Sequence, residues 1–258
     1  MPKKFVADFT VVENKKLNST NFLIKIKSDL TLPEIKPGQF VNVEVKDAAD
    51  IFLRRPFSVF EVDYRENTLS MIIKILGRGS KKLTQIKEGE SMSLVFPLGK
   101  SFTYPEQTDR ILLIGGGSGV APMLFLAKES GLPVDNVDIL LGARTREDHI
   151  DVCNYSSYAK LHYASEDGSL GEKGFVTQHS VFTTNLAAYN KIYACGPDGM
   201  MRAIAKEAKA AGVFCEVSLE NLMACGFGVC LCCIEPTNKG NQCVCTDGPV
   251  FNINELKW

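Results

Sequence analysis

The chain has 258 residues, of which 45% are apolar and 23% charged, and its formal net charge is −1 at pH 7. This composition is ordinary for a globular protein of two domains with a small appendage. The balanced charge argues against nucleic acid or an anionic membrane as a partner. No apolar run approaches the ~18 residues of a membrane-spanning helix. Nine cysteines without an apparent signal peptide indicate a reducing compartment, so we expect a cytoplasmic protein.

The first hundred residues alternate apolar and polar side chains, which is typical of β-strands. Six short strands are predicted, at 5–12, 21–26, 40–45, 57–62, 69–75 and 91–95. One short helix is predicted at 80–86, after Gly77-Arg78-Gly79. Because so little helix separates the strands, we expect a small antiparallel barrel.

From about residue 105, strands alternate with helices, which is typical of a parallel sheet with right-handed crossovers. Strands are predicted at 110–114, 137–141, 161–164, 191–194 and 214–217, and helices at 120–130, 174–182 and 197–211. Pro97, Gly99 and Pro105 mark the junction between the two patterns.

The densest cysteine run lies near the C-terminus. Cys225, Cys230 and Cys233 stand in a C-x4-C-x2-C run, and Cys245 follows. This spacing is typical of plant-type [2Fe–2S] sites, in which four thiolates hold two irons. Glycines between the first two cysteines allow a tight loop whose N–H groups approach the sulfurs. The run therefore predicts an iron–sulfur site.

Two other readings of the cysteines stay open. A structural zinc site is expected as two short C-x2–4-C pairs, and disulfides would need an oxidising compartment. The ligand register is also open, because Cys232 and Cys243 could replace Cys233 or Cys245. Spacing favours Cys233, whereas the residues alone do not favour Cys245 over Cys243.

A first nucleotide site is predicted at Arg54-Arg55-Pro56-Phe57-Ser58. An arginine fork fits a pyrophosphate, an apolar ring can lie against a flat heterocycle, and serine can bond a polar ring edge. A basic pair before a strand is, by itself, more often a solvated edge. Gly77-Arg78-Gly79-Ser80 strengthens the prediction, because its N–H groups could bind the same phosphates at a helix start.

A second nucleotide site is predicted at Gly115-Gly116-Gly117-Ser118-Gly119-Val120-Ala121-Pro122, between a strand and a helix. The pattern is G-G-x-G-x-x-P rather than G-x-G-x-x-G. A purely structural turn would not need four glycines, each of which costs up to ~1 kcal/mol of ordering. We therefore expect Gly116, Gly117 and Gly119 to contact phosphates. The next strand ends without an acidic residue for a ribose hydroxyl, so NAD and NADP both stay open.

Cys195-Gly196-Pro197 closes a further strand. Ligands bind at the carboxyl ends of parallel strands, so we expect Cys195 and Gly196 beside a nicotinamide rather than in the cluster. The alternative is a cysteine packed as a small apolar residue. The three histidines lie away from every motif, and no catalytic acid–base residue is predicted.

These motifs carry a family resemblance. Arg55-Pro56-Phe57-Ser58, Gly116-Gly117-Ser118-Gly119 and Cys195-Gly196-Pro197 resemble the ferredoxin–NADP reductase superfamily. The C-terminal end narrows this resemblance to one family. It carries Met223-Ala224-Cys225-Gly226-Phe227-Gly228-Val229-Cys230 and is closed by Cys245-Thr246-Asp247-Gly248-Pro249-Val250-Phe251. Over essentially its whole length, the chain resembles the electron-transfer subunits of dihydroorotate dehydrogenase B.

The resemblance implies FAD, one [2Fe–2S] cluster, and NAD as co-substrate. It implies a flavin site built from Arg55, Pro56, Phe57, Ser58, Ile72, Ile73, Lys74, Gly79 and Ser80. It also implies the four metal ligands Cys225, Cys230, Cys233 and Cys245, which supplies the preference for Cys245. Cys232 departs from the pattern, because an unreactive residue is expected there.

The predicted fold is an antiparallel FAD-binding β-barrel over 1–101, a parallel-sheet NAD-binding α/β domain over 102–217 and a [2Fe–2S] domain over 218–258. The resemblance further implies an FMN-containing catalytic partner that oxidises dihydroorotate in pyrimidine biosynthesis, in a heterotetramer of two of each chain. Electrons would pass from that FMN through the cluster and FAD to NAD+. An apolar surface near Phe227 and Leu231 is expected if the cluster loop is an interface.

Two alternative functions come from different classes. The first is a subunit of another flavin and iron–sulfur NAD(P)H oxidoreductase, with ferredoxin or a sulfur compound as its electron acceptor. The second is a redox-sensing or zinc-stabilised module without catalytic activity.

Overall fold

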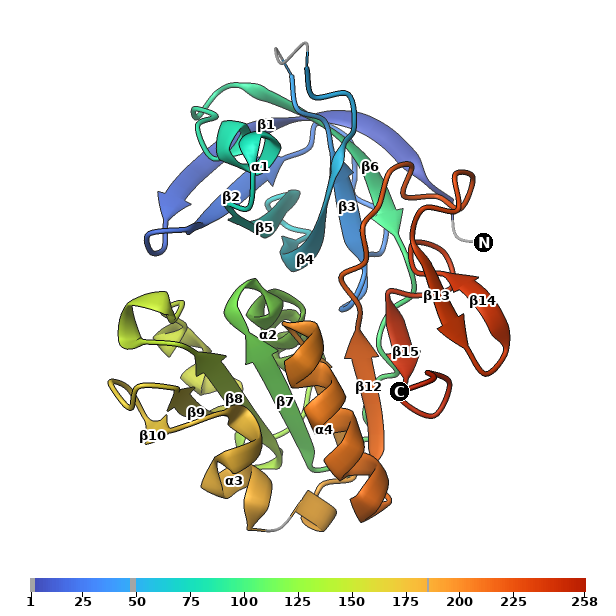
Figure 1. The fold of residues 1–258 in the computed structure, drawn as a ribbon. Coiled ribbons are helices and arrows are strands. Elements are labelled where there is room, and N and C mark those ends of the chain that lie inside the picture. The colour runs from blue at the N-terminus through green and yellow to red at the C-terminus, as the bar shows by residue number, and fades with distance from the viewer. Residues whose placement is uncertain (1–2, 47–49, 185) are drawn as a thin grey trace.

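The computed structural model describes residues 3–46, 50–184 and 186–258. Figure 1 shows a barrel above a sheet that is covered by helices, with the C-terminal segment running alongside both. Within the described residues, no helix combines the length and the apolar character needed to cross a membrane.

Six antiparallel strands close the barrel in the order β1-β2-β5-β4-β3-β6. Their bounds are β1 (Phe5–Lys16), β2 (Asn21–Lys27), β3 (Phe40–Val43), β4 (Arg55–Asp63), β5 (Thr68–Lys74) and β6 (Ser91–Leu98). The helix α1 (Arg78–Leu83) follows β5. The predicted barrel is confirmed. Val41 and Val43 of β3 join the barrel core, whereas Phe40 packs outside it, as expected for alternate positions of a strand.

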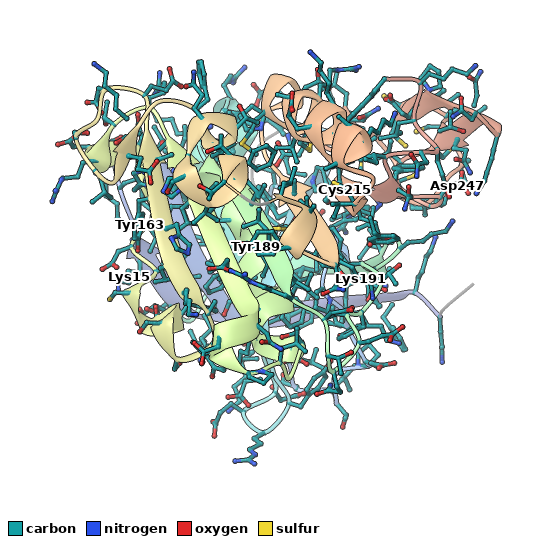
Figure 2. All side chains as sticks on the ribbon, turned by 90° about the horizontal axis from the view of Figure 1, so that it is seen from below. Lys15, Tyr163, Tyr189, Lys191, Cys215 and Asp247 are labelled. Atoms are coloured by element: carbon teal, nitrogen blue, oxygen red, sulfur yellow. The ribbon has the colours of Figure 1, made fainter. Side chains whose placement is uncertain are left out.

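The second layer is a seven-stranded sheet in the order β10-β9-β8-β7-β11-β12-β15. Its strands are β7 (Ile111–Gly116), β8 (Val137–Ala143), β9 (Lys160–Ser165), β10 (Glu172–Lys173), β11 (Lys191–Cys195), β12 (Phe214–Ser218) and β15 (Val250–Asn252). Six of them are parallel, as predicted, and β15 is antiparallel to β12. Seen from below, Tyr163 of β9 lies at the opposite side of the molecule from Asp247 (Figure 2).

Two helices cover opposite faces of this sheet. The helix α2 (Val120–Glu129) packs with Ile111 and Leu113, and α4 (Asp198–Ala211) packs with Leu112 and Ile114. Single 3-10 turns connect the other elements, at Gly117–Gly119, Val134–Asn136, Arg146–Asp148, Cys153–Ser157, Val176–Gln178 and Leu186–Ala188.

The predicted helix at 174–182 is wrong. The chain forms the 3-10 turn Val176–Gln178 and then the separate short helix α3 (Ser180–Thr183). His179 between them is extended, with φ −65° and ψ 144°, and its Nδ1 accepts the N–H of Val181 at 3.1 Å. The histidine therefore caps a new helix instead of continuing the preceding turn.

The C-terminal segment adds the hairpin β13 (Ile234–Thr237) and β14 (Gly240–Cys243) before the chain returns to the sheet as β15. Figure 1 shows this hairpin to the lower right of β6, and the loop before it contacts Asn42 of β3 and Leu98 of β6 through Cys225 and Gly226. Buried residues of the segment share one core with residues of both other layers, namely Cys233, Val244, Cys245 and Phe251 of the segment, Phe40 and Leu98 of the barrel, and Ile192 and Val217 of the sheet. The sequence did not predict that Val250–Asn252 would complete the sheet.

The barrel and the sheet are joined by packed and hydrogen-bonded contacts. Phe125 of α2 lies in the barrel core, and Lys128 of the same helix pairs with Glu61 of β4. Thr103, in the connection between the layers, donates its N–H and its hydroxyl to Glu216 at 2.8 and 2.7 Å. These contacts fix the carboxyl ends of the parallel strands against the open side of the barrel.

Candidate functional site

The first predicted nucleotide motif lies at the start of β4. Val59 of β4 stands opposite Met71 of β5, so the residues Arg55–Ser58 and Ile72–Lys74 lie at the same end of two paired strands. On the other side of β4, Asn42 stands opposite Pro56. The barrel therefore brings both halves of the predicted flavin site together.

The loop before α1 completes this end of the barrel. The Arg55 guanidinium lies against Gly79, where an added Cβ would come within 3.0 Å of Nε. The Ser80 hydroxyl accepts the N–H groups of Leu76 and Gly77 at 2.8 and 3.2 Å. Ser80 is buried, and its hydroxyl holds the turn that presents Gly79 and the start of α1. A pyrophosphate fits this cradle, because it combines a guanidinium with free N–H groups.

The second predicted motif forms a tight turn between β7 and α2. An added Cβ at Gly119 would lie 2.3 Å from the carbonyl oxygen of Cys195, and one at Gly116 would lie 2.9 Å from Pro197. Gly117 has φ +56°, and only Lys74 Nζ comes near its missing side chain, at 3.8 Å. Packing alone therefore requires several of these glycines, contrary to the expectation that a structural turn would not need them.

The end of β11 lies directly behind this turn. Cys195 is fully buried, and burial raises the pKa of its thiol well above the ordinary value. The thiol is thus protonated and lies in the sheet, away from the C-terminal cysteines. Gly196 follows with φ +152°, and its Cα region packs on Gly116. The turn, Cys195 and Gly196 form one surface at the carboxyl edge of the sheet.

Sequence reasoning missed Glu220, which follows β12 at the same edge. Its side chain is exposed, but desolvation by the neighbouring protein still raises its pKa, and the positive charge of Lys74 opposes that rise. Lys74 Nζ also comes within 3.8 Å of a Cβ added at Gly117, so one barrel residue lies against the glycine turn and acts through its charge on Glu220. Only the three-dimensional arrangement could reveal this residue, because it has no motif of its own.

The predicted metal ligands form two pairs. The thiols of Cys225 and Cys230 are in hydrogen-bonding contact, and so are those of Cys233 and Cys245. The N–H of Cys245 also points to the sulfur of Cys233 at 3.4 Å. An N–H of Gly228, in the first half of the loop, bonds the Cys245 thiol and so connects the pairs.

Cys225 of one pair and Cys245 of the other differ in the direction of their pKa shifts. Burial opposes ionisation of Cys225, but the N–H groups of Phe227, Cys230 and Val229 outweigh it and lower its pKa to about 6. Burial, followed by the contact with Cys233, raises the pKa of Cys245 to about 12. Cys225 is thus prepared to bind as a thiolate, whereas Cys245 must lose its proton when a metal binds.

This donor set fits a two-iron cluster better than zinc. In residues 3–46, 50–184 and 186–258, no three His, Cys, Asp or Glu side chains converge as ligands of a single ion. A [2Fe–2S] cluster needs two thiolates on each of two irons, which matches two separate pairs. Cys232 is exposed, and Cys243 lies nearby with its N–H bonded to Asp247 at 2.8 Å.

His162 belongs to a hydrogen-bond network of the sheet. His162 Nε2 lies 2.8 Å from Asp138, which also accepts from Arg110 and Tyr189 at 3.0 and 2.8 Å. Burial opposes ionisation of Asp138, but the bonds from His162, Tyr189 and Arg110 outweigh it and hold its pKa at about 2. Tyr189 lies well away from Asp247 in Figure 2, so this network is separate from the cysteine loop.

Three protein-family models match the chain. Residues 8–104 match an oxidoreductase FAD-binding domain, and residues 113–206 match an oxidoreductase NAD-binding domain. Residues 220–257 match the iron–sulfur cluster binding domain of dihydroorotate dehydrogenase B. The chain therefore carries FAD-binding, NAD-binding and iron–sulfur domains, as predicted, whereas the boundaries at 102 and 218 stay predictions.

Relatives match over the full length. The chain is 34% identical to the electron transfer subunit of dihydroorotate dehydrogenase B (NAD(+)) of Fusobacterium nucleatum, over 98% of each chain. The subunit of the same name from Clostridium acetobutylicum is also 34% identical, over 99% of this chain and 98% of that one. A solved NADH-dependent reduced ferredoxin–NADP oxidoreductase structure is 30% identical, with TM-score 0.86, over 98% of this chain and 90% of that one. The chain therefore belongs to the family of dihydroorotate dehydrogenase B electron-transfer subunits.

Proposed function

We propose that this chain takes electrons from the FMN of a catalytic subunit that oxidises dihydroorotate, and delivers them through a [2Fe–2S] cluster and FAD to NAD+. The observation that carries the proposal is the convergence of three predicted sites. At the flavin end of the barrel, Lys74 Nζ comes within 3.8 Å of a Cβ added at Gly117 of the glycine turn, and Asn42 of β3 donates to the Cys225 carbonyl of the cysteine loop at 3.2 Å. This convergence supports a relay within one chain.

The chain's own residues act by binding and positioning. Bound flavin would supply the exchange of electrons singly with a cluster and in pairs, as hydride, with nicotinamide. Arg55 and the Gly79–Ser80 turn would hold its phosphates, and Pro56 and Phe57 would flank its ring. The glycine turn would bind the NAD pyrophosphate at the start of α2, where N–H groups are free.

The cysteine loop would hold the cluster through Cys225, Cys230, Cys233 and Cys245. The two thiol contacts support this set, and the N–H of Gly228 supports Cys245 over Cys243. N–H groups around Cys225 would also stabilise the negative charge of a bound cluster. None of the nine cysteines forms a disulfide bond. This supports a reducing compartment, the cytoplasm, as the place of action.

The surface of the cysteine loop supports a catalytic partner. Leu222 is 86% exposed and Val229 74% exposed, and Phe227 and Leu231 are also exposed beside Cys230. Apolar side chains gathered in this way on a surface are typical of protein interfaces. A partner that covers them would bring its own cofactor close to the cluster. Two copies of each chain in a heterotetramer complete the proposed assembly.

The choice of NAD is supported by residues from β9. The N–H of Glu166 donates to the carbonyl of Ala143 at 3.1 Å, and that of Asp167 donates to Arg144 at 3.2 Å. Two acidic residues thus follow β9 at the carboxyl edge of the sheet, where the adenosine ribose of a dinucleotide binds in such sheets. Negative charge there would disfavour the 2′-phosphate of NADP. Arg144 is paired with Asp148 at 3.3 Å, which weakens its attraction for that phosphate.

A second candidate is a subunit of another flavin and iron–sulfur NAD(P)H:ferredoxin oxidoreductase, favoured by the 30% identity to the solved NADH-dependent reduced ferredoxin–NADP oxidoreductase. The deciding experiment is anaerobic. The chain is purified together with the FMN-containing dihydroorotate-oxidising subunit, and NAD+ reduction is followed with dihydroorotate as the electron donor. Dihydroorotate-dependent NADH formation that needs this chain would support the proposal. Flavin and broad absorbance bleached by NADH, with electrons passing to ferredoxin but none arriving from dihydroorotate, would favour the second candidate.

A further inference from the structure

Asn42 of β3 connects the cysteine loop to the barrel. Its side chain is 1% exposed, and its Nδ2 donates a hydrogen bond of 3.2 Å to the carbonyl oxygen of Cys225. The two residues are 183 positions apart in the chain, so the bond joins two domains. It acts on the backbone of a residue that we assign as a metal ligand.

The loop is shaped to admit this side chain. Gly226 has φ +79°, and an added Cβ there would lie 2.8 Å from Asn42 Nδ2 and 3.4 Å from Leu98. Any other residue at this position would displace the loop or the amide, because backbone with this φ is also strained for L-residues. The missing side chain of Gly226 therefore leaves the space that the Asn42 amide occupies.

The opposite edge of β3 leads to the flavin motif. Asn42 stands directly opposite Pro56 in the antiparallel pair of β3 and β4. Directly opposite residues project on the same face of a sheet. Val41 and Val43 face the barrel core, so Asn42 and Pro56 share the outer face. One side chain thus touches the Cys225 backbone and neighbours the first strand of the flavin site.

The amide has an unused acceptor. Asn42 Oδ1 is buried and has no hydrogen-bond partner among the described residues. The carbonyl of Cys225 fixes the orientation of the amide, since Oδ1 in place of Nδ2 would meet another oxygen. The acceptor is therefore available to a donor bound on the outer face.

We propose that Asn42 is the positioning residue between cluster and flavin: it holds the Cys225 end of the cluster loop against β3 beside Pro56, and so fixes their separation for single-electron transfer. This inference rests on the proposed function. It assigns no chemical step to Asn42, which acts through the Cys225 backbone. The competing explanation is that Asn42 only stabilises the fold.

Three variants separate these explanations. Asn42→Leu removes the donor and the acceptor, whereas Asn42→Asp keeps the shape and the acceptor but removes the donor. Gln39→Leu is the matched control, because Gln39 is also a buried amide before β3 and donates to the carbonyl of Gly99 at 3.0 Å. It removes a bond of the same kind without touching the cysteine loop.

The first measurement uses the metal-free chain and does not depend on activity. Amide hydrogen exchange is followed for residues 223–231 and for the barrel strands. Both Asn42 variants are expected to exchange at least about tenfold faster in 223–231, with the barrel unchanged, because the loop loses its tie. Gln39→Leu should leave 223–231 unchanged. Equal protection of 223–231 in Asn42→Leu and the unsubstituted chain would overturn the proposal.

The second measurement uses the loaded chain and rapid mixing with NADH under anaerobic conditions. NADH is oxidised to NAD+, its electron pair reduces the flavin, and one electron then passes to the oxidised cluster. We expect Asn42→Leu to leave the flavin phase unchanged and to slow bleaching of the cluster roughly tenfold. Equal slowing of both phases would identify a role in fold stability alone. A lack of cluster bleaching in the unsubstituted chain would contradict the proposed function, while hydrogen exchange would still test Asn42.

Discussion

The glycine turn of the sheet and the cysteine loop both present N–H groups to a predicted ligand, yet they are held in different ways. The turn is confined on several sides by backbone and buried side chains, including the Cys195 carbonyl and Val120. The loop exposes Leu222, Val229, Cys230 and Leu231, and Asn42 reaches it from the barrel. Packing of the fold therefore holds the turn in place, whereas the loop depends on its bound cluster and on a few hydrogen bonds such as the one from Asn42.

This difference predicts that the two regions fail independently. Damage to the loop should remove the cluster and spare the reaction of NADH with the flavin. Damage to the turn should impair that reaction and spare the cluster.

The largest effect is expected for Cys230→Ser. Iron content should fall from about two per chain to near zero, because one iron loses half of its thiolates. NADH should still reduce the flavin, since the turn is untouched. Metal analysis and anaerobic visible spectra measure both results.

Neighbouring cysteines give the controls for this experiment. Cys232→Ser and Cys243→Ser should keep their iron, and Cys245→Ser should lose it. If Cys245→Ser kept its iron and Cys243→Ser lost it, Cys243 rather than Cys245 would be the fourth ligand.

The second effect concerns the turn. Gly119→Ala puts a Cβ 2.3 Å from the Cys195 carbonyl, so α2 and β11 must move apart. We expect a loss of about 1–3 kcal/mol in the free energy of unfolding, as for other overpacked sites. NADH reduction of the flavin should slow at least tenfold, roughly the cost of a misplaced binding group. Iron content should stay the same.

Gly199→Ala is the matched control for the turn, because nothing lies within 4 Å of its added Cβ. It should leave flavin reduction unchanged and raise helix stability by up to about 1 kcal/mol. A loss of iron in Gly119→Ala would show that the two regions do not fail independently.

A smaller effect is expected for Gly226→Ala against Gly240→Ala. Both glycines have positive φ, at +79° and +98°, so each alanine costs about 1–2 kcal/mol of backbone strain. Only Gly226→Ala also crowds Asn42, since nothing lies within 4 Å of a Cβ at Gly240. Denaturant unfolding should show a larger loss for Gly226→Ala, by about 1 kcal/mol. Equal losses would show that crowding of Asn42 adds no further cost to Gly226→Ala.

The smallest effect is a pH dependence within the metal-free loop. The folded pKa of Cys225, about 6, lies below the unfolded value of ~8.5. Its thiolate therefore stabilises the fold fully above about pH 8.5, and this contribution is lost as the pH falls through 6. Alkylation of Cys225, followed by mass spectrometry, should be half-maximal near pH 6, and only near pH 8.5 in the urea-unfolded chain. Identical profiles in the two states would contradict the role of the loop N–H groups.

Much of this architecture follows from local patterns. Alternation along 40–45 and 69–75 predicted barrel strands, and the apolar run before Gly115 predicted a central parallel strand. The spacing of Cys225, Cys230 and Cys233 was enough to identify the cysteine loop. Each of these signals is short in sequence and arises from one element.

The rest depends on contacts between distant residues. Asn42 occupies an ordinary strand position, and only the register with Pro56 and the approach of Cys225 give it a role. Glu220 has no motif, and its raised pKa depends on neighbouring protein and on Lys74, a barrel residue far from it in the sequence. The helix predicted at 174–182 failed because one histidine side chain caps the next helix, which helical periodicity does not reveal.

The return of the chain as β15 has a consequence for dissecting the protein. Glu216, Val217 and Ser218 of β12 pair with Asn252, Phe251 and Val250, so the last strand covers what would otherwise be an open sheet edge. Removing residues after 218 would leave those N–H and C=O groups free to pair with another molecule. The segment that holds the cysteines thus also protects the neighbouring domain from edge-to-edge aggregation. A fragment that keeps only the first two domains should therefore carry a charged residue or a proline in β12.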